Sequence, residues 1–271
     1  MKKMLVTGGS GFLGSRVVEY FSETYEVYAP SHTEMDITQA GAVDRTMDHF
    51  RPDVVIHCAA MADTGLCRRE PELSWQRNVV GSINVARAAG RVGAKCLLCS
   101  SDQVYFALPT NLYATEKLTA EQECLRINPD CVFLRLTWMY DPALTDINQR
   151  NDFFTGLLQN LYTSEPVSYA IYDRRGITDV NEVVRNMEKA IAIPGGAYDF
   201  GSPNAKSMFE TAASLFHGLG LDPARVKENR DAFKDTPRDM TLNTKPINDL
   251  GIYFSDTTQA LIRNFGQYKP S

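Results

Sequence analysis

The chain has 271 residues, a formal net charge of −5 at pH 7 and 44% hydrophobic residues. This length can bury one large α/β core with a smaller appended lobe, and the acidic balance argues against a general nucleic-acid-binding surface while leaving room for a local basic pocket. No segment has the apolar length of a membrane span and no signal peptide follows the opening Met-Lys-Lys, so we expect a cytoplasmic protein with neither nucleic acid nor membrane as a partner.

The first predicted element is a buried strand that meets a glycine-rich turn. Gly8, Gly11 and Gly14 have G-x-x-G-x-x-G spacing, and residues 12–20 follow with helical period. In such a strand–turn–helix the first glycine allows a sharp turn, the second lets backbone N–H groups approach a pyrophosphate, and the third lets the helix pack closely. The helix N-terminus then favours the anion. Glycine is also common in ordinary tight turns, so this motif alone predicts a dinucleotide site only weakly.

The second predicted strand, 26–29, ends where a dinucleotide fold usually places an acid against the adenosine ribose. Pro30, Ser31 and His32 stand there instead. Because no carboxylate follows the strand to repel a 2′-phosphate, NADP(H) is favoured and NAD(H) is the alternative. Ser31, His32 or Arg16 would supply the donors, although an ordinary polar loop has the same composition.

Helix and strand then alternate along the first half of the chain. We expect Thr38 to cap a helix over 39–50, a strand over 54–60 that is buried on both faces, and a long helix over 71–92. The small pair Ala59-Ala60 lets a cofactor pass close over the end of its strand. This alternation predicts right-handed βαβ units and a doubly wound parallel sheet.

Cys96 and Cys99 have the C-x-x-C spacing of some redox and metal sites. They lie in the apolar run 94–100, which is typical of a central strand, whereas redox pairs begin a helix and zinc pairs come with a second pair. Six cysteines in a chain of this length do not indicate a disulfide scaffold. We therefore predict core packing for the pair and no metal site.

The acid–base candidates follow this strand. Tyr113 and Lys117 begin a helix predicted to end near residue 127, and their i, i+4 spacing places both on one face. Taken singly, a tyrosine in a first helical turn is more often a packing residue and a lysine is more often solvated. Together, after a nucleotide turn and with Ser101 ending the preceding strand, they predict an acid–base group aimed at one ligand.

These motifs together resemble the extended short-chain dehydrogenase/reductase superfamily, whose members combine Thr-Gly-x-x-Gly-x-x-Gly with Ser/Thr and Tyr-x-x-x-Lys. Within it the chain is most similar to the dTDP-4-dehydrorhamnose reductase family, through residues 100–105 and 135–140. The resemblance covers nearly the whole chain. It implies a Rossmann domain of residues 1–140 with about 166–200, and a small substrate-binding lobe of about 141–165 with 201–271.

The resemblance also implies residue roles. Tyr113 would be the general acid that protonates a carbonyl oxygen as hydride arrives from the nicotinamide, and Ser101 would fix the same oxygen. Lys117 would hold the nicotinamide ribose and lower the pKa of the tyrosine. Asp36 and Ile37 would face the adenine. The residues expected to bind the cofactor are Thr7, Gly8, Ser10, Gly11, Phe12, Leu13, Gly14, Ser31, His32, Asp36, Ile37, Cys58, Ala59, Ala60, Asn78, Tyr113 and Lys117.

For the substrate, the resemblance implies a phosphate-bearing small molecule. Arg175 would clamp its diphosphate through two parallel hydrogen bonds, with Arg174 as the fallback. Gln103 stands where sugar dehydratases carry a proton-transferring acid, and Phe106 stands where epimerases commonly have glycine. An NAD(P)H-dependent reductase of a carbonyl, above all a nucleotide-linked 4-keto-6-deoxy sugar, is therefore favoured over an epimerase. The expected substrate-binding residues are Asp102, Gln103, Trp138, Arg175 and Arg238.

Two departures from the family pattern keep a different class of function open. Only residues 106–112 separate Tyr105 from Tyr113, where the family has a longer loop over the substrate, and Ala114 replaces a glycine. The alternative is a non-catalytic NADP-binding regulatory subunit that resembles the methionine adenosyltransferase β-subunit, to which residues 67–73 are also similar. The intact Ser-Tyr-Lys set argues against it.

The predicted helices 71–92 and 113–127 commonly form a dimer interface in this superfamily. The resemblance therefore implies a homodimer, which nothing in the sequence itself establishes.

Overall fold

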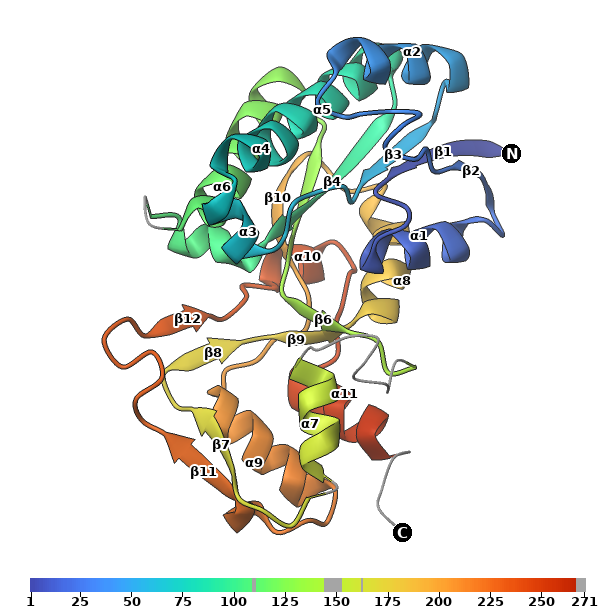
Figure 1. Ribbon diagram of the computed structural model, residues 1–271. Coiled ribbons are helices and arrows are strands. Elements are labelled where there is room, and N and C mark those ends of the chain that lie inside the picture. The colour runs from blue at the N-terminus through green and yellow to red at the C-terminus, as the bar shows by residue number, and fades with distance from the viewer. Residues whose placement is uncertain (109–110, 144–152, 162, 267–271) are drawn as a thin grey trace. The chain divides into compact units, whose positions relative to one another are not determined.

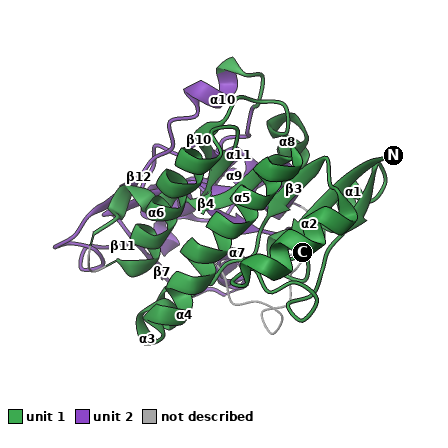
Figure 2. Ribbon diagram, turned by 90° about the horizontal axis from the view of Figure 1, so that it is seen from above, with its two compact units in different colours: residues 1–136, 184–199, 249–252 green, residues 137–183, 200–248, 253–271 purple. Residues whose placement is uncertain are grey.

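The computed structural model describes residues 1–108, 111–143, 153–161 and 163–266 (Figure 1). The chain divides into two compact units, each built from several segments (Figure 2). Unit 1 comprises Met1–Leu136, Val184–Asp199 and Asp249–Ile252; unit 2 comprises Thr137–Val183, Phe200–Asn248 and Tyr253–Ser271. Over the described ranges, every helix is too short or too polar to cross a bilayer.

A six-stranded parallel sheet of order β10-β5-β4-β3-β1-β2 organises unit 1. Its central strands are buried on both faces because both faces are covered by helices. Chain order reverses at β1, which lies between β2 and β3, and this is the switch point at which doubly wound sheets bind ligands. The predicted Rossmann fold is confirmed. The strands are β1 Lys2–Thr7, β2 Tyr25–Tyr28, β3 Val54–His57, β4 Lys95–Ser101, β5 Val132–Leu136 and β10 Gly196–Phe200.

Helices cover the two faces of this sheet (Figure 1). On one face α2, α5 and α6 lie side by side, and on the other α1 is joined to α8 by a hydrogen bond from the Tyr20 hydroxyl to Glu188, 3.0 Å. The buried residues of α1, Leu13, Val17 and Phe21, recur every four residues, which explains its orientation. The helical segments are α1 Phe12–Phe21, α2 Ala40–Phe50, α3 Thr64–Arg69, α4 Pro71–Trp75, η1 Gln76–Val80, α5 Gly81–Val92, η2 Asp102–Phe106, α6 Leu112–Ile127 and α8 Val180–Ala190.

Three local predictions in unit 1 need correction. Gln39, not Thr38, caps α2, because the Thr38 hydroxyl donates to the Asp36 carboxylate at 2.8 Å. The strand predicted over 54–60 ends at His57. The helix predicted over 71–92 is interrupted by the π-helical turn η1, a feature often found at functional sites.

The described residues of unit 2 form three two-stranded parallel sheets, β7 with β11, β8 with β12 and β6 with β9. Its core gathers apolar residues of α7, α9 and α11, and α9 begins with a capping box of Ser207 and Glu210. The elements are β6 Trp138–Tyr140, α7 Phe153–Leu161, β7 Val167–Ala170, β8 Asp173–Arg175, β9 Ile177–Asp179, α9 Met208–Gly218, η3 Pro223–Arg225, β11 Val226–Asn229, β12 Arg238–Met240, α10 Lys245–Asp249 and α11 Thr257–Phe265.

In the second half of the chain the sequence predicts a helix over 151–162 and a strand over 167–172 that returns to the main sheet; the second of these predictions is wrong. β7 pairs with β11, and the strand that joins the six-stranded sheet is β10. Residues 166–183, predicted with the nucleotide domain, group with unit 2 because β7, β8 and β9 find their partners there. The predicted helix 151–162 is α7; residues 151, 152 and 162, and residues 109 and 110 of the short loop, lie outside the described residues.

Candidate functional site

A pocket of about 480 Å³ opens in unit 1 at the carboxyl ends of β1 and β3, beside the switch point of the sheet. Three segments that are far apart in the sequence meet there: residues 7–11, 30–37 and 58–60. The sequence predicted most of this lining, but not Gly9, Pro30, Met35 and Arg77. The lining residues are Thr7, Gly8, Gly9, Ser10, Gly11, Pro30, Ser31, His32, Met35, Asp36, Ile37, Cys58, Ala59, Ala60 and Arg77.

The glycine turn has the geometry of a pyrophosphate cradle. Gly8 has φ +69°, and a Cβ there would come within 2.7 Å of the Ala59 nitrogen. A Cβ on Gly14 would overlap the Gly8 carbonyl, so α1 packs directly on the turn. Gly11 is the N-cap of α1 and no side chain caps this end of the helix. The positive end of the α1 dipole therefore lies at the glycine turn, where the N-cap makes no side-chain hydrogen bond, and such a helix end favours an anion.

A buried histidine beneath this pocket links β1, β3 and α5 through hydrogen bonds. His57 Nδ1 shares a 2.7 Å hydrogen bond with the Thr7 hydroxyl, and its Nε2 shares one of 3.2 Å with Ser82 on α5. Burial, assisted by the Lys117 charge, lowers the pKa of His57 to about 3, so the imidazole is neutral at pH 7. The four histidines lack ligand spacing in the sequence. Only the pairing of β1 with β3 shows that this one joins the two strand ends.

The adenine end predicted for the pocket carries charge of both signs. Burial opposes ionisation of Asp36, but hydrogen bonds from Thr38 and the charges of His32 and Arg77 outweigh it, and the pKa of the carboxyl is lowered. Arg77, on the π-helical turn, lines the pocket from the residue just before the predicted Asn78. Sequence reasoning missed Arg77 because a half-buried arginine on a helix has no motif of its own.

A carboxylate does reach the end of β2, although none follows that strand directly. Glu34 accepts hydrogen bonds from the Ser31 backbone N–H at 2.7 Å and from the Ser31 hydroxyl at 2.6 Å. These bonds lower the pKa of Glu34. The Ser31 hydroxyl predicted to serve a 2′-phosphate is thus engaged by an acid.

The three residues predicted to form an acid–base group lie at the end of β4 and in the first turns of α6. Ser101, Tyr113 and Lys117 are all buried. Lys117 Nζ lies 5.9 Å from the centre of the Tyr113 ring and donates to the Cys99 carbonyl at 2.9 Å. The Ser101 hydroxyl donates to Asp102 and accepts from the Gln103 backbone N–H, each at 3.2 Å.

The protonation of this group differs from expectation. Burial raises the pKa of Tyr113 well above its ordinary value; the hydrogen bond with Ser101 acts in the opposite sense, and the Asp102 carboxylate adds to the rise. The prediction of a lowered Tyr113 pKa is therefore wrong. Burial also lowers the pKa of Lys117, although neighbouring acidic groups oppose this. The phenol keeps its proton at neutral pH, which suits a general acid and not a base.

Several predicted residues support the site without lining the pocket. Asn78 is fully buried; its amide donates to the Met61 carbonyl at 3.0 Å and to Glu116 on α6 at 2.8 Å. Leu13 and Gly14 are buried in α1, and the Phe12 ring lies against Arg16, 4.4 Å from the guanidinium. Their predicted contact with a cofactor stays a prediction.

The predicted substrate-binding arginines lie in unit 2, next to one carboxylate. Arg175 is 1% exposed and donates to Asp173 Oδ1 at 3.2 and 3.3 Å, while its guanidinium stacks 4.0 Å from the Trp138 ring centre. Arg238 donates to the other oxygen of Asp173 at 3.1 Å. Arg174, the fallback clamp, is exposed. The structure thus brings Trp138, Arg175 and Arg238 together as predicted. Both guanidinium groups, however, bind the protein's own Asp173 carboxylate.

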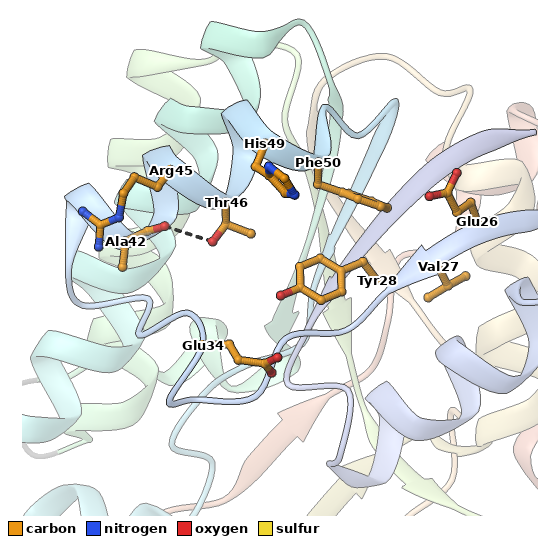
Figure 3. Close-up of a pocket in the computed structure, with 9 residues that line it drawn as sticks. All are labelled: Glu26, Val27, Tyr28, Glu34, Ala42, Arg45, Thr46, His49 and Phe50. Carbon is orange, nitrogen blue, oxygen red and sulfur yellow. Dashed lines mark hydrogen bonds between the residues drawn. The ribbon is translucent and has the colours of Figure 1, made fainter.

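A second, larger pocket of about 610 Å³ lies between β2 and α2 (Figure 3). The Tyr28 and Phe50 rings, 5.3 Å apart, form part of its wall, and the Thr46 hydroxyl bonds its own helix at the Ala42 carbonyl. None of the residues predicted to bind cofactor or substrate lines it.

Comparison with known proteins gives one family match and relatives of two kinds. The family model described as RmlD substrate binding domain matches residues 1–252. A dTDP-4-dehydrorhamnose reductase of Mycobacterium tuberculosis is 26% identical over 247 residues, covering 83% of this chain and 78% of the relative. Methionine adenosyltransferase 2 subunit beta of Xenopus laevis is 32% identical over 281 residues, covering 93% and 83%. The crystal structure of a dTDP-4-dehydrorhamnose reductase from Bacillus anthracis in complex with NADP superimposes with a TM-score of 0.81 at 23% identity, covering 99% of this chain and 100% of that one.

Proposed function

Because the chain belongs to the RmlD substrate binding domain family, we propose that it is an NAD(P)H-dependent reductase of a carbonyl compound, with a nucleotide-linked 4-keto-6-deoxy sugar as its substrate. The observation that carries the proposal is the buried group of Ser101, Tyr113 and Lys117 in the unit that also holds the glycine cradle. A protein that only bound the nucleotide would not need a protonated phenol there.

The cradle fits a dinucleotide because its backbone leaves no room for side chains at Gly8 and Gly14 and leaves the first turn of α1 without a side-chain cap. Gly8, Gly11 and the start of α1 would hold the pyrophosphate, Asp36 and Ile37 the adenosine end, and Lys117 the nicotinamide ribose. The bound cofactor supplies a hydride. NADP(H) is the favoured form, as in the Bacillus anthracis neighbour, and NAD(H) is the alternative.

In this proposal, Tyr113 gives its proton to the carbonyl oxygen, and Ser101 donates a hydrogen bond to the same oxygen. The raised pKa of Tyr113 keeps the proton in place until the oxygen becomes basic. The Ser101 hydroxyl has a single proton, which it donates to Asp102 at 3.2 Å in the structure and would turn to the carbonyl oxygen when substrate binds. Lys117 is positioned by the Cys99 carbonyl and shields the phenolate that forms.

The test is NADPH oxidation, followed by absorbance, with a dTDP-linked 4-keto-6-deoxy sugar and with simpler carbonyl compounds. We expect Tyr113→Phe to bind NADPH as the unchanged protein does and to lose turnover by about 10²- to 10⁴-fold, since only the proton donor is removed. Tyr198→Phe, which loses a hydrogen bond to the Pro194 carbonyl on the surface, serves as the matched control and should retain turnover. Equal turnover by the unchanged protein and Tyr113→Phe would refute the role given to the phenol.

One observation favours a second candidate, a non-catalytic NADP-binding regulatory subunit. The 32% identity to the methionine adenosyltransferase subunit exceeds the 26% identity to the Mycobacterium tuberculosis reductase. Both candidates bind NADPH, so only turnover separates them. NADPH binding without reduction of any carbonyl tested, together with a change in the activity of a methionine adenosyltransferase, would favour the subunit. The expected cytoplasmic location and homodimer stay predictions.

A further inference from the structure

Two cysteines meet at the floor of the nucleotide pocket. β3 and β4 are parallel neighbours with His57 opposite Leu98, so the next residues, Cys58 and Cys99, are also opposite, and their sulfur atoms are 3.7 Å apart. Neighbouring strands lie about 4.8 Å apart, within the Cα separation of about 4.4–6.8 Å that a disulfide allows. The sulfurs need to approach by less than about 2 Å to reach bonding distance, which side-chain rotation and a small backbone shift supply.

These two thiols are also the accessible ones. Cys58 lines the pocket, and both Cys58 and Cys99 are partly exposed. The other four cysteines, Cys67, Cys96, Cys124 and Cys131, are 0 or 1% exposed. Cys96 lies on the same strand as Cys99, three residues away, and so points to the opposite face, into the core. The core packing predicted for the C-x-x-C pair therefore holds for Cys96 and not for Cys99.

The surroundings distinguish the two sulfurs. The hydrogen bond with Cys58 lowers the pKa of Cys99, against burial, and the Lys117 charge lowers it further. The same hydrogen bond and burial raise the pKa of Cys58. The two sulfurs, 3.7 Å apart, are close enough for one to attack the other once it is oxidised, which is the arrangement of an attacking and a resolving cysteine.

We propose that Cys58 and Cys99 form a reactive dithiol site whose substrate is a hydroperoxide, and that its product is a disulfide across β3 and β4. The Cys99 thiolate attacks the terminal peroxide oxygen, the O–O bond breaks, and the alkoxide leaves as an alcohol after taking a proton. The Cys58 sulfur then attacks the sulfenic acid of Cys99, the S–O bond breaks, and water leaves with the Cys58 proton. Two electrons pass from the two sulfurs to the hydroperoxide, which is reduced to alcohol and water.

Oxidation of the dithiol should change the nucleotide pocket, because Cys58 lines the pocket and the Cys99 carbonyl holds Lys117. Drawing the two strand ends together displaces Cys58 from the pocket lining and shifts the Cys99 carbonyl that positions Lys117. Oxidation should therefore weaken NADPH binding, and bound NADPH should slow oxidation. This coupling rests on the proposed function, whereas formation of the disulfide does not.

The test uses the full chain, reduced, desalted and treated with hydrogen peroxide or cumene hydroperoxide, then alkylated and digested with trypsin. We expect a mass loss of 2 Da and a reducible cross-link between the peptides 46–68 and 96–117. These peptides also contain Cys67 and Cys96. Cys96→Ala is therefore the matched control and should form the cross-link, whereas Cys99→Ala should not. Fragment ions of the unchanged protein assign the bond without any variant.

Alkylation of both Cys58 and Cys99 after peroxide treatment, or a cross-link that persists in Cys99→Ala, would overturn the proposal. NADPH in excess should slow cross-linking severalfold, and cross-linked protein should bind NADPH severalfold more weakly than the reduced protein. A protein that forms the bond and does not bind NADPH would retain the dithiol site and refute the proposed function instead.

Discussion

The two groups of residues predicted to bind ligands, the glycine turn in unit 1 and the arginines in unit 2, are used in different ways. At the turn the backbone itself makes the cradle, and no side chain caps the helix end that faces it. In unit 2 the guanidinium groups of Arg175 and Arg238 both bond Asp173. A glycine motif determines a backbone shape locally, whereas the availability of an arginine depends on which acid the fold brings to it.

The largest expected effect tests the arginine side of this comparison. Asp173→Ala leaves the buried Arg175 charge without its carboxylate, which costs about 3–5 kcal/mol. We expect denaturant unfolding to show that loss and hydrogen exchange to rise in β8 and β12. NADPH affinity should change little, because the cradle lies in unit 1.

Asp235→Ala, at an exposed position shortly before β12, is the control and should cost little. If Asp173→Ala were as stable as Asp235→Ala and bound phosphate-bearing ligands more tightly, Arg175 would be a ligand-binding residue that Asp173 blocks. It would not then be part of a structural ion pair.

The next effect concerns the glycine turn. Gly11→Val places a branched side chain beside the Gly8 carbonyl, which a Cβ alone would approach to 3.2 Å. If overpacking of about 1–3 kcal/mol is lost from binding, the NADPH affinity falls about 5- to 150-fold. Fluorescence titration measures it. Gly156→Val in α7, where a Cβ would meet nothing within 4 Å, is the control; equal affinities for the two variants would contradict the cradle.

The buried histidine predicts a pH dependence for unit 1. The pKa of His57 is about 3 in the folded protein and about 6.5 unfolded, so below pH 6.5 only the unfolded chain takes up this proton. Stability should therefore fall by about 1.4 kcal/mol per pH unit between pH 6 and 3 from this group. Urea unfolding of His57→Gln and the unchanged protein at pH 7 and pH 5 isolates the effect. If His57→Gln and the unchanged protein lost the same stability between pH 7 and pH 5, the pKa of His57 in the folded protein would not be lowered.

The smallest effect concerns cofactor choice. Glu34→Gln removes the negative charge beside Ser31 and so should raise the affinity for NADPH relative to NADH by about two- to fivefold, as expected for an exposed charge. Glu26→Gln, within β2 itself, is the control. An unchanged ratio of the two affinities would place the 2′-phosphate away from Ser31.

Sequence reasoning reached the parallel sheet, the glycine turn and the Ser-Tyr-Lys group because each depends on short-range pattern. Apolar runs define β3 and β4, and i, i+4 spacing brings Tyr113 and Lys117 to one face of α6. It missed the partner of β7, the capping residue of α2 and the role of Arg77. Those depend on residues that are distant in sequence or on competing local hydrogen bonds.

The amino-acid sequence alone determined the kind of fold, because hydrophobic period and glycine placement act over a few residues. Through its resemblance to a known superfamily it also predicted which residues form the acid–base group. The tertiary structure alone decided that His57 joins β1 to β3, that Asp173 holds two arginines and that Cys58 faces Cys99. In each case the physical reason is the same. Charge, protonation and thiol reactivity depend on neighbours within a few ångströms, and only strand pairing and packing bring those neighbours together.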